Sequence, residues 1–167
     1  WHDGLIYKLA NLNLPNKLGD WLMDFIVKRK FYVKVNSDKS ELININNGVA
    51  QGTILSPILF CIFINDIMEI NSLPTNRIHS LLFADDLFAM TIDKNANRVM
   101  NIMQVYLKKL EIWFNKWRLQ VAAHKCSFNI YKKGKIPKNI KNFDFLNYSQ
   151  VVKLFSMELM DQLKLLQ

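Results

Sequence analysis

The sequence of 167 residues contains little cysteine or histidine and has no long hydrophobic run. Its two cysteines, Cys61 and Cys126, lie far apart, which argues against a small secreted domain built on disulfides. They cannot form a zinc site alone, and the three histidines show no metal-ligand spacing with them. The most apolar run, Ile54 to Ile64, is too short to span a bilayer.

The composition is that of a folded, basic protein. Hydrophobic residues make up 50% of the chain and aromatic residues 12%, so a sizeable core can form. The net charge of +8 favours a polyanionic partner, such as nucleic acid or an anionic membrane surface. A merely basic soluble protein is the simpler alternative. The chain begins with Trp1 rather than Met, and we interpret it as a fragment whose true start is missing.

Two apolar runs of strand length, Ile78 to Phe83 and Leu87 to Ile92, flank a pair of carboxylates, Asp85 and Asp86. The runs predict a β-hairpin covered on both faces, with the two aspartates at a two-residue tip. Adjacent carboxylates repel unless something positive neutralises them, so the pair is a candidate site for a divalent metal ion. A solvated turn is the alternative, because Asp is a good turn residue.

Apolar residues recur at helical spacing in four further stretches. They predict helices at Gly4 to Leu12, Lys17 to Lys30, Ser56 to about Glu69, and Asn95 to Trp117. The third is apolar all round and is expected to be buried, with Ser56 as its N-cap and Pro57 at its first position. The fourth carries a stripe that indicates core packing, formed by Val99, Met103, Tyr106, Leu110, Trp113 and Trp117.

Two other stretches have open interpretations. Phe31 to Val35 and Glu41 to Asn46 alternate and predict a second hairpin, polar on one face. Gly48 and Gly52 then flank Gln51 in a loop that could bring its backbone close to a planar or phosphate-bearing ligand, although most such loops are only connections. A lysine-rich stretch near the end suits either a nucleic-acid backbone or a solvated surface, and comprises Lys132, Lys133, Lys135, Lys138 and Lys141.

Taken in order, these motifs resemble the palm of a reverse transcriptase, specifically that of jockey-like non-LTR retrotransposons. Four blocks carry the resemblance over nearly the whole chain: Trp1 to Leu9, Gly48 to Asp66, Phe83 to Asp86, and Trp113 to Cys126. They are similar to the family's "VWHxGLxxKL", "GxPQGxxLSPxLFxxYIND", "[YF]xDD" and "W...W.L.xN..K" segments. The resemblance implies an α+β fold, a polymerase palm with helices packed on one face of an antiparallel sheet, here partial and without the fingers.

The resemblance also implies a chemistry. In the family, a primer hydroxyl attacks a nucleoside triphosphate while two ions, Mg²⁺ or also Mn²⁺, clamp the attacking and leaving oxygens. Asp85 and Asp86 are the implied catalytic metal ligands. The implied nucleotide and template contacts are Gln51, Gly52, Phe83, Ala84 and Lys125, and the implied contacts to the nucleic-acid backbone are Lys132, Lys133 and Lys135.

The implied partners are an RNA template, a DNA primer and deoxynucleoside triphosphates, with no membrane. For an intact element, the resemblance adds an endonuclease domain and a location in the nucleus. We expect residues 1–131 to form the partial palm, and residues 132–167 to form the basic loop and the start of the primer-grip and thumb region. The alternative function is a non-catalytic, nucleic-acid-binding remnant of a retroelement.

Some positions depart from the family pattern. A third metal-binding carboxylate and the fingers lie upstream of the family's "VWH" segment, so we expect the chain alone to be inactive. Ala50 and Ala122 stand where the family has proline and asparagine. Lys153 to Met157 resembles the family's primer grip, with Ser156 in place of glycine.

Overall fold

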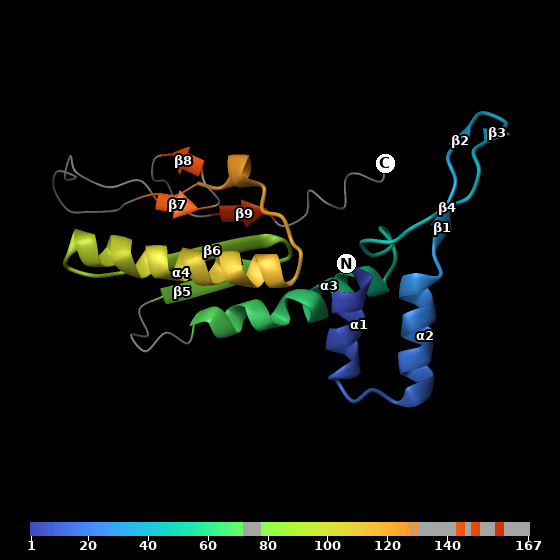
Figure 1. The fold of residues 1–167 in the computed structure, drawn as a ribbon, viewed down its shortest axis with the longest axis horizontal. Coiled ribbons are helices and arrows are strands. Elements are labelled where there is room, and N and C mark those ends of the chain that lie inside the picture. The colour runs from blue at the N-terminus through green and yellow to red at the C-terminus, as the bar shows by residue number, and fades with distance from the viewer. Residues whose placement is uncertain (72–77, 128, 130–142, 146–147, 151–155, 159–167) are drawn as a thin grey trace. The chain divides into compact units, whose positions relative to one another are not determined.

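The computed structural model describes residues 1–71, 78–127, 129, 143–145, 148–150 and 156–158 (Figure 1). The chain forms two compact units, residues 1–65 and 66–167, and each is described by itself. Among the helices of the described residues, none combines the length and the hydropathy that a membrane span requires.

Helices α1 (His2–Ala10), α2 (Asn16–Val27) and α3 (Leu55–Ile64) build the core of the first unit, and α1 packs against both others. The core side chains they contribute are Leu5, Leu9, Leu22, Ile26, Leu59 and Phe63. Gly4 lies at the close approach of α1 to its neighbours, since an added Cβ would lie 2.5 Å from the Trp1 ring. The first two predicted helices are thereby confirmed. α2 ends earlier than predicted, because Lys30 already belongs to a strand.

The second predicted hairpin is also confirmed, as a two-part ribbon in the first unit. β1 (Lys30–Phe31) pairs antiparallel with β4 (Ile43–Asn44), and β2 (Lys34–Val35) pairs with β3 (Asp38–Lys39). The link between β1 and β2 has two residues, 32–33, whereas the opposite link between β3 and β4 has three, 40–42. The extra residue in the second link forms a β-bulge. Side chains on both faces of residues 32–44 are exposed.

Helix α3 differs from its prediction in three respects. It begins at Leu55, after Ile54 and without a side-chain cap, so Ser56 lies within its first turn and the predicted cap is wrong. It ends at Ile64, where a 3₁₀ helix, η1 (Asn65–Asn71), continues the chain. It is buried on one side only, because Leu59 and Phe63 face the core while Ile58 is exposed.

A three-stranded antiparallel sheet and one long helix organise the second unit. The sheet order is β5 (Ile78–Phe83), β6 (Asp86–Thr91) and β9 (Ser156–Glu158). Ile78, Leu87 and Ala89 are buried on the face that α4 (Ala96–Lys116) covers. The remaining described elements are the 3₁₀ helix η2 (Ala123–Lys125) and a pair of short strands, β7 (Phe143–Phe145) and β8 (Tyr148–Gln150). Both units combine helices with small antiparallel sheets, as the predicted α+β class requires.

The other face of the β5–β6 hairpin is open. Leu81 is 68% exposed and Phe83 is 83% exposed, and Met90 is exposed as well. The prediction that both faces are covered is therefore wrong, because α4 packs against one face and none of the described elements buries the second. The residues on this face are therefore apolar and yet exposed in the described structure.

Helix α4 confirms the predicted core stripe except at its start, where Val99 is only half-buried. Met103, Tyr106, Leu110, Trp113 and Trp117 are buried, at steps of three and four residues. Burial raises the pKa of the Tyr106 phenol to about 12, and a hydrogen bond with the Ser80 side chain of β5 acts in the opposite direction. Trp113 donates its indole N–H to Oδ1 of Asp66, at 3.2 Å.

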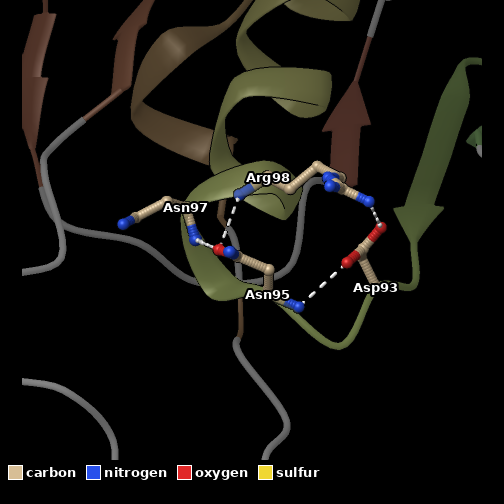
Figure 2. A network of polar contacts seen from close by, with 4 residues as sticks. All are labelled: Asp93, Asn95, Asn97 and Arg98. Carbon is tan, nitrogen blue, oxygen red and sulfur yellow. Dashed lines mark hydrogen bonds and ion pairs between the residues drawn. The ribbon is translucent and has the colours of Figure 1, made fainter.

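A polar network fixes the start of α4, directly after the β5–β6 hairpin (Figure 2). The side-chain oxygen of Asn95 accepts hydrogen bonds from the backbone N–H groups of Asn97, at 2.9 Å, and Arg98, at 3.3 Å. Asp93 in turn accepts from the backbone N–H of Asn95 and forms an ion pair with Arg98. The network provides acceptors for N–H groups that have no partner within the helix. It confirms that the predicted helix has its N-terminal boundary at Asn95.

Candidate active site

The two aspartates lie where β5 turns into β6. The strands pair in register from Ile78 with Thr91 to Phe83 with Asp86, so Ala84 and Asp85 alone form the loop. The predicted hairpin is confirmed, but its tip lies one residue earlier than predicted, because Asp86 is the first residue of β6. Directly paired residues share a face, so Asp86 lies on the same open face as Phe83. Asp85 is half-buried, and Asp86 is exposed.

The turn holds Asp85 through an unusual backbone conformation at the preceding residue. Ala84 has a φ of +50°, in the left-handed region that glycine normally occupies. Such a conformation costs an alanine about 1–2 kcal/mol. Conformations of this kind persist where the surrounding structure over-determines them, and they cluster at functional sites. Here the flanking pairs of β5 and β6 impose the turn and so fix the direction in which Asp85 leaves the hairpin.

The donor set at the tip suits a hard cation. Asp85 and Asp86 offer carboxylate oxygens, which are the protein ligands that Mg²⁺ and Mn²⁺ prefer. Within the part of the chain that the structure describes, no group of three or more His, Cys, Asp or Glu side chains could hold a metal ion. Two carboxylates fall short of such a group, so a metal ion at the tip needs further ligands.

Strand β9 lies beside this tip. It pairs with the first three residues of β6, with Ser156 opposite Phe88 and Glu158 opposite Asp86. β9 includes the end of the segment that resembles a primer grip, whose earlier residues, 153–155, lie outside the described part. The pairing brings this segment next to Asp86, and no local sequence pattern predicts that the two strands pair. Its role as a primer grip stays a prediction.

The glycine loop is a tightly hydrogen-bonded turn in the first unit. Gly48 and Gly52 both have φ near +70°, at 71° and 75°, which explains why glycine occupies them. Ser56 and Thr53 lie 2.6 Å apart through their hydroxyl oxygens, and both contact the carbonyl oxygen of Ala50. Gln51 and Gly52 are exposed at the apex of this loop.

Two residues that the sequence patterns did not predict as partners of the loop hold its start. Nε2 of His2 lies 2.9 Å from the carbonyl oxygen of Gly48, and Arg29 donates to the same oxygen. Burial lowers the pKa of His2, and the positive charge of Arg29, 3.1 Å away, lowers it further. The hydrogen bond to Gly48 acts in the opposite direction. Nε2 faces both the Gly48 oxygen, to which it can donate, and the Arg29 guanidinium, from which it can accept, and these two contacts need opposite tautomers of the neutral ring. No local pattern reveals the contact, since 46 residues separate His2 from Gly48.

This contact predicts a pH-dependent stability of the first unit. Because the pKa of His2 is lower in the folded chain than its ordinary value of 6.5, the unfolded chain takes up a proton first as the pH falls. The contribution of His2 to the stability of the first unit is therefore fully present above about pH 6.5 and declines below it. Hydrogen exchange of the α1 and α2 amides at about pH 7 and about pH 5 should show a smaller decline for His2→Gln than for the unaltered chain.

The exposed histidine His79, in the other unit, supplies the matched control, His79→Gln. The His79 variant should follow the unaltered chain in the first unit at both pH values. An equal decline for His2→Gln and the unaltered chain would show that His2 does not couple protonation to folding.

The other predicted site residues are placed in part. Lys125 lies in η2 and is half-buried, and Ala84 is exposed at the turn. Gln51 and Gly52 belong to the first unit, and Asp85 and Asp86 to the second, so their assembly into one site stays a prediction. The predicted backbone contacts, Lys132, Lys133 and Lys135, lie outside the described residues.

Comparisons with known proteins identify relatives of the chain. Residues 1–150 match the family described as reverse transcriptase (RNA-dependent DNA polymerase). The chain is 30% identical over 130 residues to the RNA-directed DNA polymerase from mobile element jockey of Drosophila melanogaster, and 32% identical to that of Drosophila funebris. It is 30% identical over 128 residues to a probable RNA-directed DNA polymerase from transposon BS of Drosophila melanogaster.

The matches cover most of this chain but little of each relative. They include 76% of the chain for the two jockey polymerases and 75% for the BS polymerase, and 14% of each relative's length. No solved structure matches the chain. The family match extends over far more than half of the 167 residues and takes in the glycine loop, the Asp85–Asp86 hairpin and α4. The chain therefore belongs to the reverse transcriptase family.

Proposed function

We propose that this chain is the palm segment of an RNA-directed DNA polymerase from a retrotransposon, without the fingers. The observation that carries the proposal is the pair Asp85 and Asp86 at the tip of a hairpin, in a chain of this family. The pair lies at the open end of a sheet backed by α4, where a nucleic acid and a triphosphate can approach. The exposure of Asp86 and Phe83 supports such access.

In the proposed site, Asp85 and Asp86 hold a Mg²⁺ ion, or Mn²⁺. The bound ion supplies charge stabilisation for phosphoryl oxygens during nucleotidyl transfer. The strained turn at Ala84 keeps the two carboxylates in place, and the exposed ring of Phe83 lies on the same strand face as Asp86, next to the primer terminus.

The remaining contacts of the proposed site come from more distant residues. Gln51 and Gly52 contact the templating base pair and the incoming nucleotide, and Lys125 contacts its phosphates. Lys132, Lys133 and Lys135 contact the nucleic-acid backbone, and the overall charge of +8 supports a polyanionic partner. The proposed domain boundary separates residues 1–131, as the palm, from residues 132–167, as the basic loop and the start of the thumb. The partners are an RNA template, a DNA primer and deoxynucleoside triphosphates, with an endonuclease domain elsewhere in the element.

A segment exchange tests this proposal. The part of the Drosophila melanogaster jockey polymerase that corresponds to this chain, which includes the 130 matched residues, is replaced by the whole 167-residue chain. We expect the chimera to extend a DNA primer on an RNA template with Mg²⁺, whereas the 167-residue chain alone does not. The chain alone offers two carboxylates at the tip, and a misplacement of reacting groups by about 1 Å already costs on the order of a hundredfold.

The departures from the family pattern provide the control. A second chimera carries Ala50→Pro, Ala122→Asn and Ser156→Gly, which restore the family residues. If neither chimera extends a primer while both bind RNA–DNA duplex, the segment is a non-catalytic, nucleic-acid-binding remnant and the polymerase proposal is wrong. Extension by the second chimera alone would locate the defect in those three positions.

A further inference from the structure

Two lysines face each other across the end of the exposed ribbon in the first unit. Lys34 of β2 and Lys39 of β3 are directly paired, beside the two-residue turn of Asn36 and Ser37. Directly opposite residues of an antiparallel pair share a face, with Cβ atoms about 4.5–5.5 Å apart. Like charges in this arrangement destabilise a hairpin. An isolated two-stranded hairpin is already marginal in water, so this repulsion is costly where it occurs.

No carboxylate of the ribbon compensates for the repulsion. Asp38 is paired with Val35 and so belongs to the opposite face. Among the described residues, neither Lys34 nor Lys39 forms an ion pair with Asp38 or Glu41. The two ammonium groups therefore present a paired positive charge to solvent.

An aromatic ring completes this face. Nζ of Lys39 lies 5.2 Å from the centre of the Tyr32 ring, a cation–π contact that holds the lysine against the strand. Tyr32 lies between β1 and β2, and its contact with Lys39 places its ring beside the lysine pair. Both lysines and the tyrosine are exposed. We call Tyr32, Lys34 and Lys39 the ribbon face.

We propose that the ribbon face binds the phosphodiester backbone of an RNA–DNA duplex. A phosphate between two ammonium groups removes the repulsion that the empty pair carries, so the hairpin gains stability where it binds. The duplex is chosen because the chain is a reverse transcriptase, and in this respect the inference rests on the proposed function.

The test measures binding of the whole chain to a labelled RNA–DNA duplex by fluorescence anisotropy over a series of salt concentrations. Lys34→Gln with Lys39→Gln should weaken binding about tenfold near 0.1 M salt, and should reduce the slope of log K against log salt by roughly 2. Lys17→Gln with Lys94→Gln removes the same charge from exposed positions outside the ribbon and should have a much smaller effect. Equal losses for the two double variants would show that only net charge matters, and would overturn the inference.

A second variant separates binding from folding. Lys39→Glu turns the repulsive pair into an attractive one, so hydrogen exchange of the ribbon amides should slow while affinity for the duplex falls. Unchanged affinity in this variant would contradict the inference. The second probe is polyglutamate with the same charge as the duplex. If its binding depends on the two lysines as strongly as binding of the duplex does, the ribbon face binds an acidic polypeptide instead. Failure of the unaltered chain to bind the duplex at any salt concentration would count against the proposed function itself.

Discussion

Replacing Asp85 by Asn in the primer-extending chimera should lower the extension rate by at least about a thousandfold. The change keeps the size of the side chain and removes its charge, so the metal ion loses a ligand. Metal stabilisation of phosphoryl oxygens is worth several kcal/mol, and each loss of about 1.4 kcal/mol costs a factor of ten. Single-turnover extension with Mg²⁺ measures the effect on the chemical step.

Asp20→Asn is the matched control, because Asp20 is an exposed carboxylate on α2. It should leave the rate within about twofold of the chimera, as expected for a surface substitution. Binding of the RNA–DNA duplex should be the same for both variants, which separates a loss of chemistry from a loss of folding. If Asp85→Asn extends primers as well as Asp20→Asn, the carboxylate at the hairpin tip takes no part in catalysis.

The largest expected effect on stability comes from Leu110→Ala. Leu110 is completely buried at the centre of the α4 stripe, and truncating it removes apolar contact and leaves a cavity. The free energy of unfolding of the second unit should fall by about 2–5 kcal/mol. Hydrogen exchange of the α4 amides measures this loss for the second unit by itself.

The same helix supplies the comparison. Ile112 lies two residues further along α4 and is 68% exposed, so Ile112→Ala should change the free energy of unfolding by less than about 0.5 kcal/mol. The two variants remove apolar carbons from one helix and differ mainly in burial. Equal effects would mean that α4 does not pack on the β5–β6 hairpin through the stripe of Leu110.

Periodicity was sufficient to predict the elements that position the aspartates. The apolar runs on both sides of Asp85 and Asp86 predicted the hairpin, and the spacing of Met103, Tyr106 and Leu110 predicted the buried face of α4. These signals are local, because a strand repeats every two residues and a helix about every 3.6. The one-residue shift of the tip could not be predicted, since it depends on the pairing of Phe83 with Asp86.

The contacts that hold the glycine loop were beyond local patterns for a different reason. His2 reaches the carbonyl oxygen of Gly48 from α1, and Arg29 reaches it from the link between α2 and β1. Nothing in their neighbouring residues marks them as partners. The failed N-cap at Ser56 has a different, local cause. The hydroxyl of Ser56 contacts Ala50 and Thr53 of the preceding loop instead of capping its own helix.

The open face of the β5–β6 hairpin also affects how the chain behaves at high concentration. β5 is the edge strand of its sheet in the described structure, and its exposed residues include Leu81 and Phe83. An edge that is apolar and unprotected is a template for pairing with the same strand of another molecule. The surface that gives Asp86 access to solvent therefore also makes the isolated chain prone to aggregation.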